Sequence, residues 1–187
     1  FRRVLFRSGI CRAMIRFKQT FKALLLVLLI GTAYSSVYAQ EYLHPSVTRL
    51  IEANDSPTGV VFELIESDKK TWEWAAPMIK SLKQQLKEKY PDIEIAVVSH
   101  GSEQFQLTRK SAKKQKAAIS ILEDLVRNEN VDLHVCGTHS SWVGIPASSY
   151  IDIVDVAVSG PAKINDYINL GYQPIQLHKP NNYSPSE

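Results

Sequence analysis

The hydrophobic pattern of the chain changes repeatedly between two periods. Short runs rich in β-branched and aromatic residues, typical of strands, alternate with longer segments whose apolar residues recur every three or four positions, typical of helices. Residues 58–65, for instance, are Thr-Gly-Val-Val-Phe-Glu-Leu-Ile, whereas residues 72–89 place Ala75, Leu82 and Leu86 on one face of a helix. The pattern predicts a domain in which strands and helices follow one another in turn.

Five strands are expected in this alternation, at residues 58–65, 93–99, 131–136, 153–159 and 172–177. Helices are expected at residues 72–89, 111–128 and 162–169, with shorter helical turns at 47–52 and 140–145. Strands that alternate with helices favour right-handed crossovers and a mainly parallel sheet. The fold class is therefore predicted to be α/β, with about five mainly parallel strands and helices on both faces of the sheet.

The first 39 residues have a different pattern. From Met14, the expected start of translation, three cations precede an apolar run of 11 residues at 23–33. Val37-Tyr38-Ala39 then places small or tolerated residues at the positions that signal peptidase reads. This order is typical of a signal peptide cleaved after Ala39. A retained membrane anchor is the alternative, but a spanning helix needs about 20 apolar residues.

The expected organisation follows from this segment. Residues 1–39 are assigned to upstream sequence and signal peptide, 40–56 to an N-terminal arm, 57–178 to the α/β domain and 179–187 to a loose tail. The mature protein is expected to be exported, in the periplasm, without stable insertion into the membrane.

The net charge of +3 conceals an uneven distribution. Seven of the 22 Lys and Arg residues precede residue 40, where no acidic residue occurs, so residues 40–187 carry 15 basic and 19 acidic side chains. A mildly acidic domain argues against binding of nucleic acid. Five cations nevertheless cluster within residues 109–116. They predict a solvated helix face, with contact to an anion or a membrane surface as the alternative.

Candidate chemistry gathers at the carboxyl ends of the predicted strands, where open α/β sheets bind their ligands. The candidate catalytic residues are Cys136 at the end of the third strand, His100 after the second, and His139 three residues beyond the cysteine. A ligand pocket is expected from the neighbouring loop residues Gly101, Gly137, Trp142, Ser159 and Gly160, with Trp142 as its roof.

Cys136 is the only cysteine beyond the expected signal peptide, because Cys11 precedes Met14. It therefore has no partner for an internal disulfide. A thiolate at a strand-to-helix turn, with an imidazole from His100 or His139 to stabilise it or move its proton, would be a nucleophile. Two alternatives stay open: a small buried core cysteine, and a metal site that includes His134. No cofactor or metal is assigned, since the spacing matches no closed zinc pattern.

Three segments resemble the DsrE/DsrF-like family in their order and spacing. They are Ile-Ala-Val-Val-Ser-His-Gly at 95–101, Val-Asp-Leu-His-Val-Cys-Gly at 131–137 and Val-Ala-Val-Ser-Gly-Pro-Ala at 156–162. The resemblance spans residues 59–177 and implies a flavodoxin-like layered fold and assembly as a homotrimer or homohexamer. It also implies a persulfide on Cys136, exchanged with a sulfur donor or acceptor protein.

Two features differ from the sulfur-relay members of that family. Those members are cytoplasmic, and the sequence Gly-Thr-His-Ser-Ser-Trp after Cys136 replaces their Ala- and Arg-rich helix start. Two functions are therefore carried forward: a sulfurtransferase-like sulfur carrier that uses Cys136, and a non-enzymatic ligand-binding or assembly module. The sequence has no Gly-rich phosphate loop and no nucleophile elbow at Ser141, which argues against nucleotide binding and serine hydrolysis.

Overall fold

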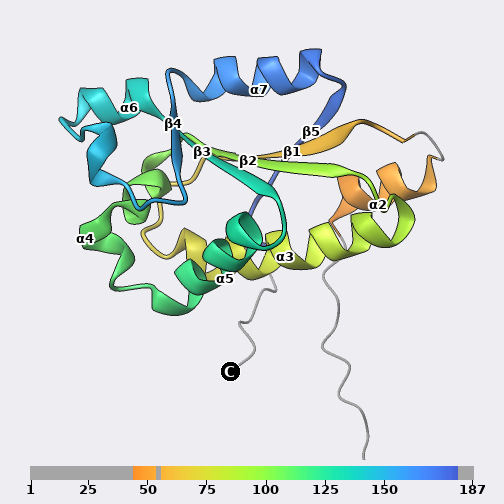
Figure 1. Ribbon diagram of the computed structural model, residues 1–187, viewed down its shortest axis with the longest axis horizontal. Helices are drawn as coiled ribbons and strands as arrows, with labels where there is room; N and C mark the ends of the chain where they lie inside the picture. Colours follow the sequence, from red (N-terminus) through yellow and green to blue (C-terminus); the bar gives the residue numbers. More distant parts are fainter. Residues whose placement is uncertain (1–43, 54–55, 181–187) are drawn as a thin grey trace, which may run out of the picture. The chain divides into compact units, whose positions relative to one another are not determined.

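The computed structural model describes residues 44–53 and 56–180, which form a single parallel sheet with its helices (Figure 1). The strand order is β4-β3-β2-β1-β5, and every neighbouring pair is parallel. The strands are β1 (Gly59–Leu64), β2 (Glu94–Ser99), β3 (Val131–Cys136), β4 (Asp155–Ala157) and β5 (Tyr172–Gln176). The predicted parallel α/β architecture is confirmed.

Helices cover both faces of the sheet, as predicted. Figure 1 shows α2, α3 and α5 on one face, α7 on the other, and α6 near the end of β3. The helices are α2 (Pro45–Glu52), α3 (Thr71–Lys89), α4 (Arg109–Ala112), α5 (Lys116–Arg127), α6 (Gly137–Trp142) and α7 (Gly160–Asn169), with 3-10 turns η1 (Ser102–Leu107) and η2 (Ala147–Ser149).

The hydrophobic cores on the two faces of the sheet differ in size. The side under α2, α3 and α5 contains the larger core, with Phe62, Trp72 and Leu122 almost fully buried. The α7 side has a smaller cluster of Val61, Ala96, Val98, Ile164, Tyr167 and Tyr172. Each fully buried large apolar side chain contributes about 2 kcal/mol to folding. The central strands β1 and β2 are nearly continuous apolar runs because both of their faces are covered.

Two predicted elements differ from those observed, and one observed element was not expected. The helix expected at 111–128 is broken into α4 and α5, because the chain turns after Ala112, where the Lys114 and Gln115 N–H groups donate to the Ser111 and Ala112 carbonyls. The fourth strand, expected at 153–159, pairs over only three residues as the edge strand β4. The 3-10 turn η1 was not predicted.

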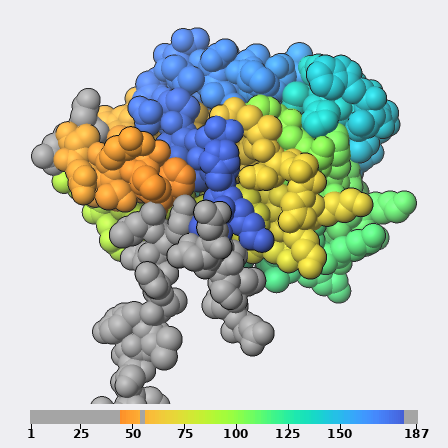
Figure 2. Space-filling model, turned by 180° about the vertical axis from the view of Figure 1, so that it is seen from behind, coloured from red at the N-terminus to blue at the C-terminus, as the bar shows by residue number. Residues whose placement is uncertain are grey.

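The segment expected as an N-terminal arm contributes to the core. Val47 of α2 is fully buried, and the Tyr90 hydroxyl donates to the Leu50 carbonyl at 3.0 Å. At the C-terminal end of the domain, β5 forms the edge of the sheet beside β1. Figure 2 shows this C-terminal part at the surface, between α2 and the segment that follows β1. The predicted signal peptide lies outside the described residues. Within them, no helix combines the length and apolar character needed to cross a membrane.

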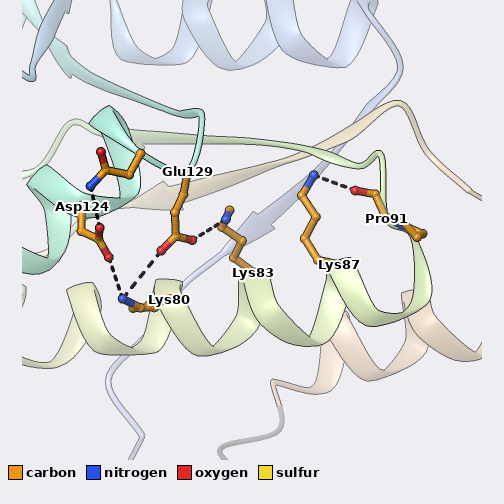
Figure 3. A network of polar contacts seen from close by, with 7 residues as sticks. Lys80, Lys83, Lys87, Pro91, Asp124 and Glu129 are labelled. Carbon is orange, nitrogen blue, oxygen red and sulfur yellow. Dashed lines mark hydrogen bonds and ion pairs between the residues drawn. The ribbon is translucent and has the colours of Figure 1, made fainter.

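A network of charged side chains joins α3 to α5 and the turn after it (Figure 3). Glu129 lies 2.5 Å from the Lys83 ammonium and 3.6 Å from that of Lys80, which also binds Asp124 at 2.8 Å. The Lys83 side chain is 10% exposed, whereas those of Lys80 and Asp124 are 35% and 40% exposed. The Lys83–Glu129 pair is therefore the partly desolvated member of the network.

Candidate functional site

The carboxyl ends of β2, β3 and β4 meet at one edge of the sheet. The register pairs Ser99 with Val135 and Cys136 with Ala157, so His100 follows β2 beside the end of β3. Gly160, at the start of α7, lies against His100, since a Cβ on this glycine would come within 2.5 Å of the His100 Cβ. Parallel pairing thus brings three segments that are distant in sequence to one place.

Cys136 is both the last residue of β3 and the N-cap of α6. Its Sγ accepts a hydrogen bond from the His139 backbone N–H at 3.4 Å, and the residue is 5% exposed. The chain turns at Gly137, where a Cβ would lie 2.9 Å from the Ala157 carbonyl oxygen of β4. Close approach of β4 therefore requires a residue without a side chain directly after the cysteine.

The buried neighbourhood of Cys136 is polar. Its carbonyl accepts from the Ser140 hydroxyl at 2.9 Å, and that hydroxyl shares a 2.6 Å hydrogen bond with the Tyr150 hydroxyl. Its backbone N–H donates to Gln104 Oε1 at 2.8 Å. Burial raises the pKa of Tyr150, which keeps this phenol protonated at neutral pH. The cysteine is buried, but hydrogen-bonding groups surround its backbone and its sulfur.

His139 has one ring nitrogen fixed and the other available. Its Nδ1 lies 3.0 Å from the His100 carbonyl oxygen, which can only accept, so Nδ1 carries a proton. The ring packs edge-on against Phe105, with centroids 4.9 Å apart, and tilted against Trp142 at 5.8 Å. No described residue hydrogen-bonds Nε2. A neutral His139 therefore has a proton-accepting nitrogen directly after the turn that holds the thiol.

His100 is less directly placed than the sequence suggested. Its Nε2 lies 2.8 Å from Glu63 Oε1 on β1, and its hydrogen bonds connect it to Glu63 and His139 rather than to the cysteine. The imidazole is 13% exposed. The backbone carbonyl of His100 thus orients His139, while its ring binds the neighbouring strand.

The residues expected to line a pocket have mixed positions. A Cβ on Gly101 would lie 2.2 Å from Glu103 Oε2, so Gly101 and Gly160 allow close packing of the loops. Ser159 is the half-buried N-cap of α7 and makes no side-chain cap hydrogen bond. Trp142 touches His139 but is 77% exposed. Of these residues, Gly137 lies within the turn from Cys136 to His139, which we call the cysteine turn, and Trp142 borders it.

Two further site residues, Glu103 and Gln104, were not predicted from the sequence, and both are fully buried in η1. Glu103 Oε1 accepts from the Ser99 hydroxyl at 2.6 Å and from the Gly101 N–H at 3.0 Å, and Oε2 accepts from the Glu66 N–H at 2.7 Å. Burial raises the pKa of Glu103. This carboxyl holds together the loops that follow β1 and β2. The only sequence signal was a polar run directly after a strand end.

Gln104 contacts the cysteine turn from the other side. Its Oε1 accepts the Cys136 N–H, while Nε2 has no hydrogen-bond partner in the described part of the chain. A polar side chain at this position reads as a surface residue in the sequence. Only the folded structure puts it against the cysteine.

The proposed metal ligands are not brought together. His134 lies on the α7 face with Nδ1 3.0 Å from Asp155 Oδ2 and Nε2 2.8 Å from the Tyr167 hydroxyl. Burial, reinforced by the Lys163 charge, lowers the pKa of His134. Among residues 44–53 and 56–180, no three or more His, Cys, Asp or Glu side chains are grouped so that they could share a metal ion. His134 instead connects α7 to the sheet.

Comparison with known proteins agrees with the observed topology. The structure is similar to that of a protein of unknown function, MTH1491 from Methanobacterium thermoautotrophicum, with a TM-score of 0.50 and 22% identity over 63% of this chain and 97% of that one. None of the curated proteins compared with the chain matches it. The model of the DsrE/DsrF-like family matches residues 53–177, which include every strand and the whole cysteine turn. The chain therefore belongs to the DsrE/DsrF-like family.

Proposed function

We propose that Cys136 carries sulfur as a persulfide and passes it to an acceptor. The family to which the chain belongs is linked to sulfur relay. The observation that carries the proposal is the hydrogen bond from the His139 N–H to Sγ at the N-cap of α6. This backbone donor is aimed at Sγ, the atom that must attack the sulfur donor.

The loading step balances without an added oxidant when the donor is thiosulfate. His139 Nε2 takes the thiol proton, and the Cys136 thiolate attacks the outer sulfur of thiosulfate. A new S–S bond forms to Cys136 while the S–S bond of thiosulfate breaks, and sulfite leaves with the electron pair. The product is the persulfide anion of Cys136. Transfer is the same exchange with an acceptor thiolate, which attacks the outer sulfur and returns Cys136 as thiolate.

Access to the sulfur would come from the α6 side. Cys136 itself is 5% exposed, but Gly137 and His139 are half-buried and Trp142 is exposed. An exchange partner would approach over this short helix, and a small displacement of α6 would uncover the thiol. Burial between exchanges would shield the persulfide from other thiols.

The test is sulfur loading of the mature chain from Gln40. We expect incubation with thiosulfate to add the mass of one sulfur atom in intact-protein mass spectrometry, and dithiothreitol to remove it. Cys136→Ser should take up none, and His139→Gln should load more slowly at neutral pH. Wild-type protein that stays unmodified, with a thiol that iodoacetamide does not reach in the native state, would rule the carrier out and leave a structural cysteine.

An assembly role is the second candidate, and exposed apolar side chains beside the cysteine turn favour it. Val158, Trp142 and Val143 are 88%, 77% and 53% exposed. The Thr138 N–H donates to the Val158 carbonyl at 3.0 Å, so the two segments adjoin. Burial of such side chains between copies would drive association into a homotrimer or homohexamer. Light scattering that gives a monomer mass at micromolar concentration would contradict this role.

A further inference from the structure

The side chain of Gln104 is fully buried, but only half of its amide is used. Oε1 accepts the Cys136 N–H at 2.8 Å. This bond fixes which atom of the side-chain amide is oxygen and which is nitrogen, because a nitrogen in the place of Oε1 would face another donor. Nε2 is therefore the atom that stays without a hydrogen-bond partner among the described residues.

An unpaired buried donor is unusual and unfavourable. Leaving a buried N–H unsatisfied destabilises the folded state, and almost all such groups in native proteins have a partner. Leucine or methionine could fill similar space without an unpaired donor of its own, but either would leave the Cys136 N–H without its acceptor. The orphaned N–H thus calls for an acceptor that is present in another state of the protein.

We propose that the Gln104 Nε2 donates a hydrogen bond to the outer sulfur of the Cys136 persulfide. The inference rests on the proposed function and names the group that favours the loaded form. Nε2 shares its planar amide with Oε1, which is anchored to the Cys136 backbone, so the donor is held next to the residue that is loaded. In the unloaded protein Nε2 makes no hydrogen bond to Sγ. The outer sulfur of a persulfide lies about 2.05 Å beyond Sγ and carries negative charge, so loading would supply the acceptor that Nε2 lacks.

A neutral amide suits a carrier better than a cation would. A Lys or Arg at this point would stabilise the thiolate as well as the persulfide and would hold the anion strongly against transfer. An amide that reaches only the outer sulfur acts on the loaded state alone. Gln104 is thus a positioning residue that shifts the loading equilibrium, while His139 serves the thiol itself.

Two variants separate the donor from the rest of the side chain. Gln104→Glu keeps an oxygen for the Cys136 N–H but removes the donor, and Gln104→Met keeps a neutral side chain of similar length. Gln173→Glu is the matched control, because it makes the same charge change at an exposed position of β5. The readout is the equilibrium fraction of persulfide at a fixed ratio of thiosulfate to sulfite.

We expect both Gln104 variants to lower the loading equilibrium constant about tenfold or more, as for loss of a hydrogen bond to a charged group. Gln173→Glu should match wild type, and the rate at which iodoacetamide alkylates the unloaded thiol should change little in Gln104→Met. If wild type and the Gln104 variants load equally, the role of Gln104 is wrong while the carrier function stands. If wild type does not load, the proposed function fails, and this inference with it.

A second measurement is made on the wild-type protein, so its result does not require a Gln104 variant to fold. In ¹⁵N-labelled wild-type protein, the side-chain amide signals of Gln104, assigned by their loss in Gln104→Met or by backbone connectivity, should shift when Cys136 is loaded. Unchanged amide signals in loaded protein would overturn the proposal.

Discussion

At the residue scale, the site depends on buried polar side chains whose partners come from other loops. Glu103 is fully buried, yet its carboxyl receives three hydrogen bonds, from Ser99, Gly101 and Glu66. Desolvation nevertheless outweighs these donors and raises the pKa of Glu103. The loop that bears His100 is thus held by a group whose charge is unfavourable in the folded state.

This raised pKa predicts a pH-dependent stability difference between wild type and Glu103→Gln. The folded protein binds the Glu103 proton more readily than the unfolded chain, so wild type gains stability as pH falls through the folded pKa, until the unfolded pKa of about 4.3 is reached. Glu103→Gln lacks this gain. Urea denaturation between neutral pH and about pH 4.5 should show the free energy of unfolding of wild type, relative to the variant, increasing with acidity.

The lowered pKa of His134 acts in the opposite direction. Below about pH 6.5 the unfolded chain binds a proton at His134 more readily than the folded protein does, so acidification lowers the stability of wild type. Both proteins contain His134, so its effect cancels in the difference. A difference that is independent of pH, or that shrinks on acidification, would contradict the assignment to Glu103.

At the scale of elements, α3 and α5 are joined by packing and by charge. Leu82 and Leu122 are buried in the larger core between these helices and the sheet. The Lys83–Glu129 pair closes one end of that contact, with side chains 10% and 24% exposed. On the opposite face, α7 rests on the sheet and its first residue, Gly160, meets His100.

Glu129→Gln should destabilise the domain by about 1–3 kcal/mol, because it leaves the Lys83 ammonium partly desolvated without its counter-charge. Asp124→Asn is the comparison within the same network, and its effect should be smaller, since water screens the more exposed Lys80–Asp124 pair. Urea denaturation of both variants checks the order. A larger loss in Asp124→Asn would show that exposure does not rank these pairs.

Gly160→Ala should cost about 1–3 kcal/mol and displace the start of α7, because the new Cβ would lie 2.5 Å from the His100 Cβ. Gly144→Ala is the control: its site has open space, so only the strain of its φ of +71° remains, about 1 kcal/mol. The variants should differ in a second way. NMR signals of the His100 ring, which binds Glu63, should move in Gly160→Ala and stay unchanged in Gly144→Ala.

At the scale of the whole molecule, the DsrE/DsrF-like fold gives a sheet with one thickly and one thinly covered face. Within the described part of the chain, several helices cover the first face and α7 is the helix that covers the second. We propose that this domain acts after export, because the sequence before Gln40 has the order of a signal peptide. The mildly acidic remainder of the chain fits an exported domain that does not bind nucleic acid.

Expression of the whole chain in a bacterial host tests export. The protein should be recovered from the periplasm with Gln40 as its first residue, as read by N-terminal sequencing. Ala39→Arg should block cleavage and leave a longer, membrane-associated form, because signal peptidase needs a small residue at this position. Uncleaved wild-type protein in the cytoplasmic fraction would contradict export.

Much of the fold could be predicted because its signals are local. The strand at 131–136 was predicted with both of its ends, since a β-branched run is bounded by Asn130 and Gly137. The edge strand β4 was predicted too long, because its pairing depends on how far β3 extends beside it. The break between α4 and α5 was missed, since the turn after Ala112 does not interrupt the apolar spacing.

The sequence by itself determined the order of strands and helices, the parallel sheet and the candidate thiol, because apolar periodicity and strand-end position are properties of neighbouring residues. His139 also belongs to this local set, since it reaches Cys136 within one helical turn. Only the tertiary structure decided that the His100 ring binds Glu63, that the buried Glu103 holds the loops after β1 and β2, and that the buried Gln104 contacts Cys136. Their roles arise from contacts between loops far apart in the chain, and polar residues that will be buried have the same sequence signature as those left in water.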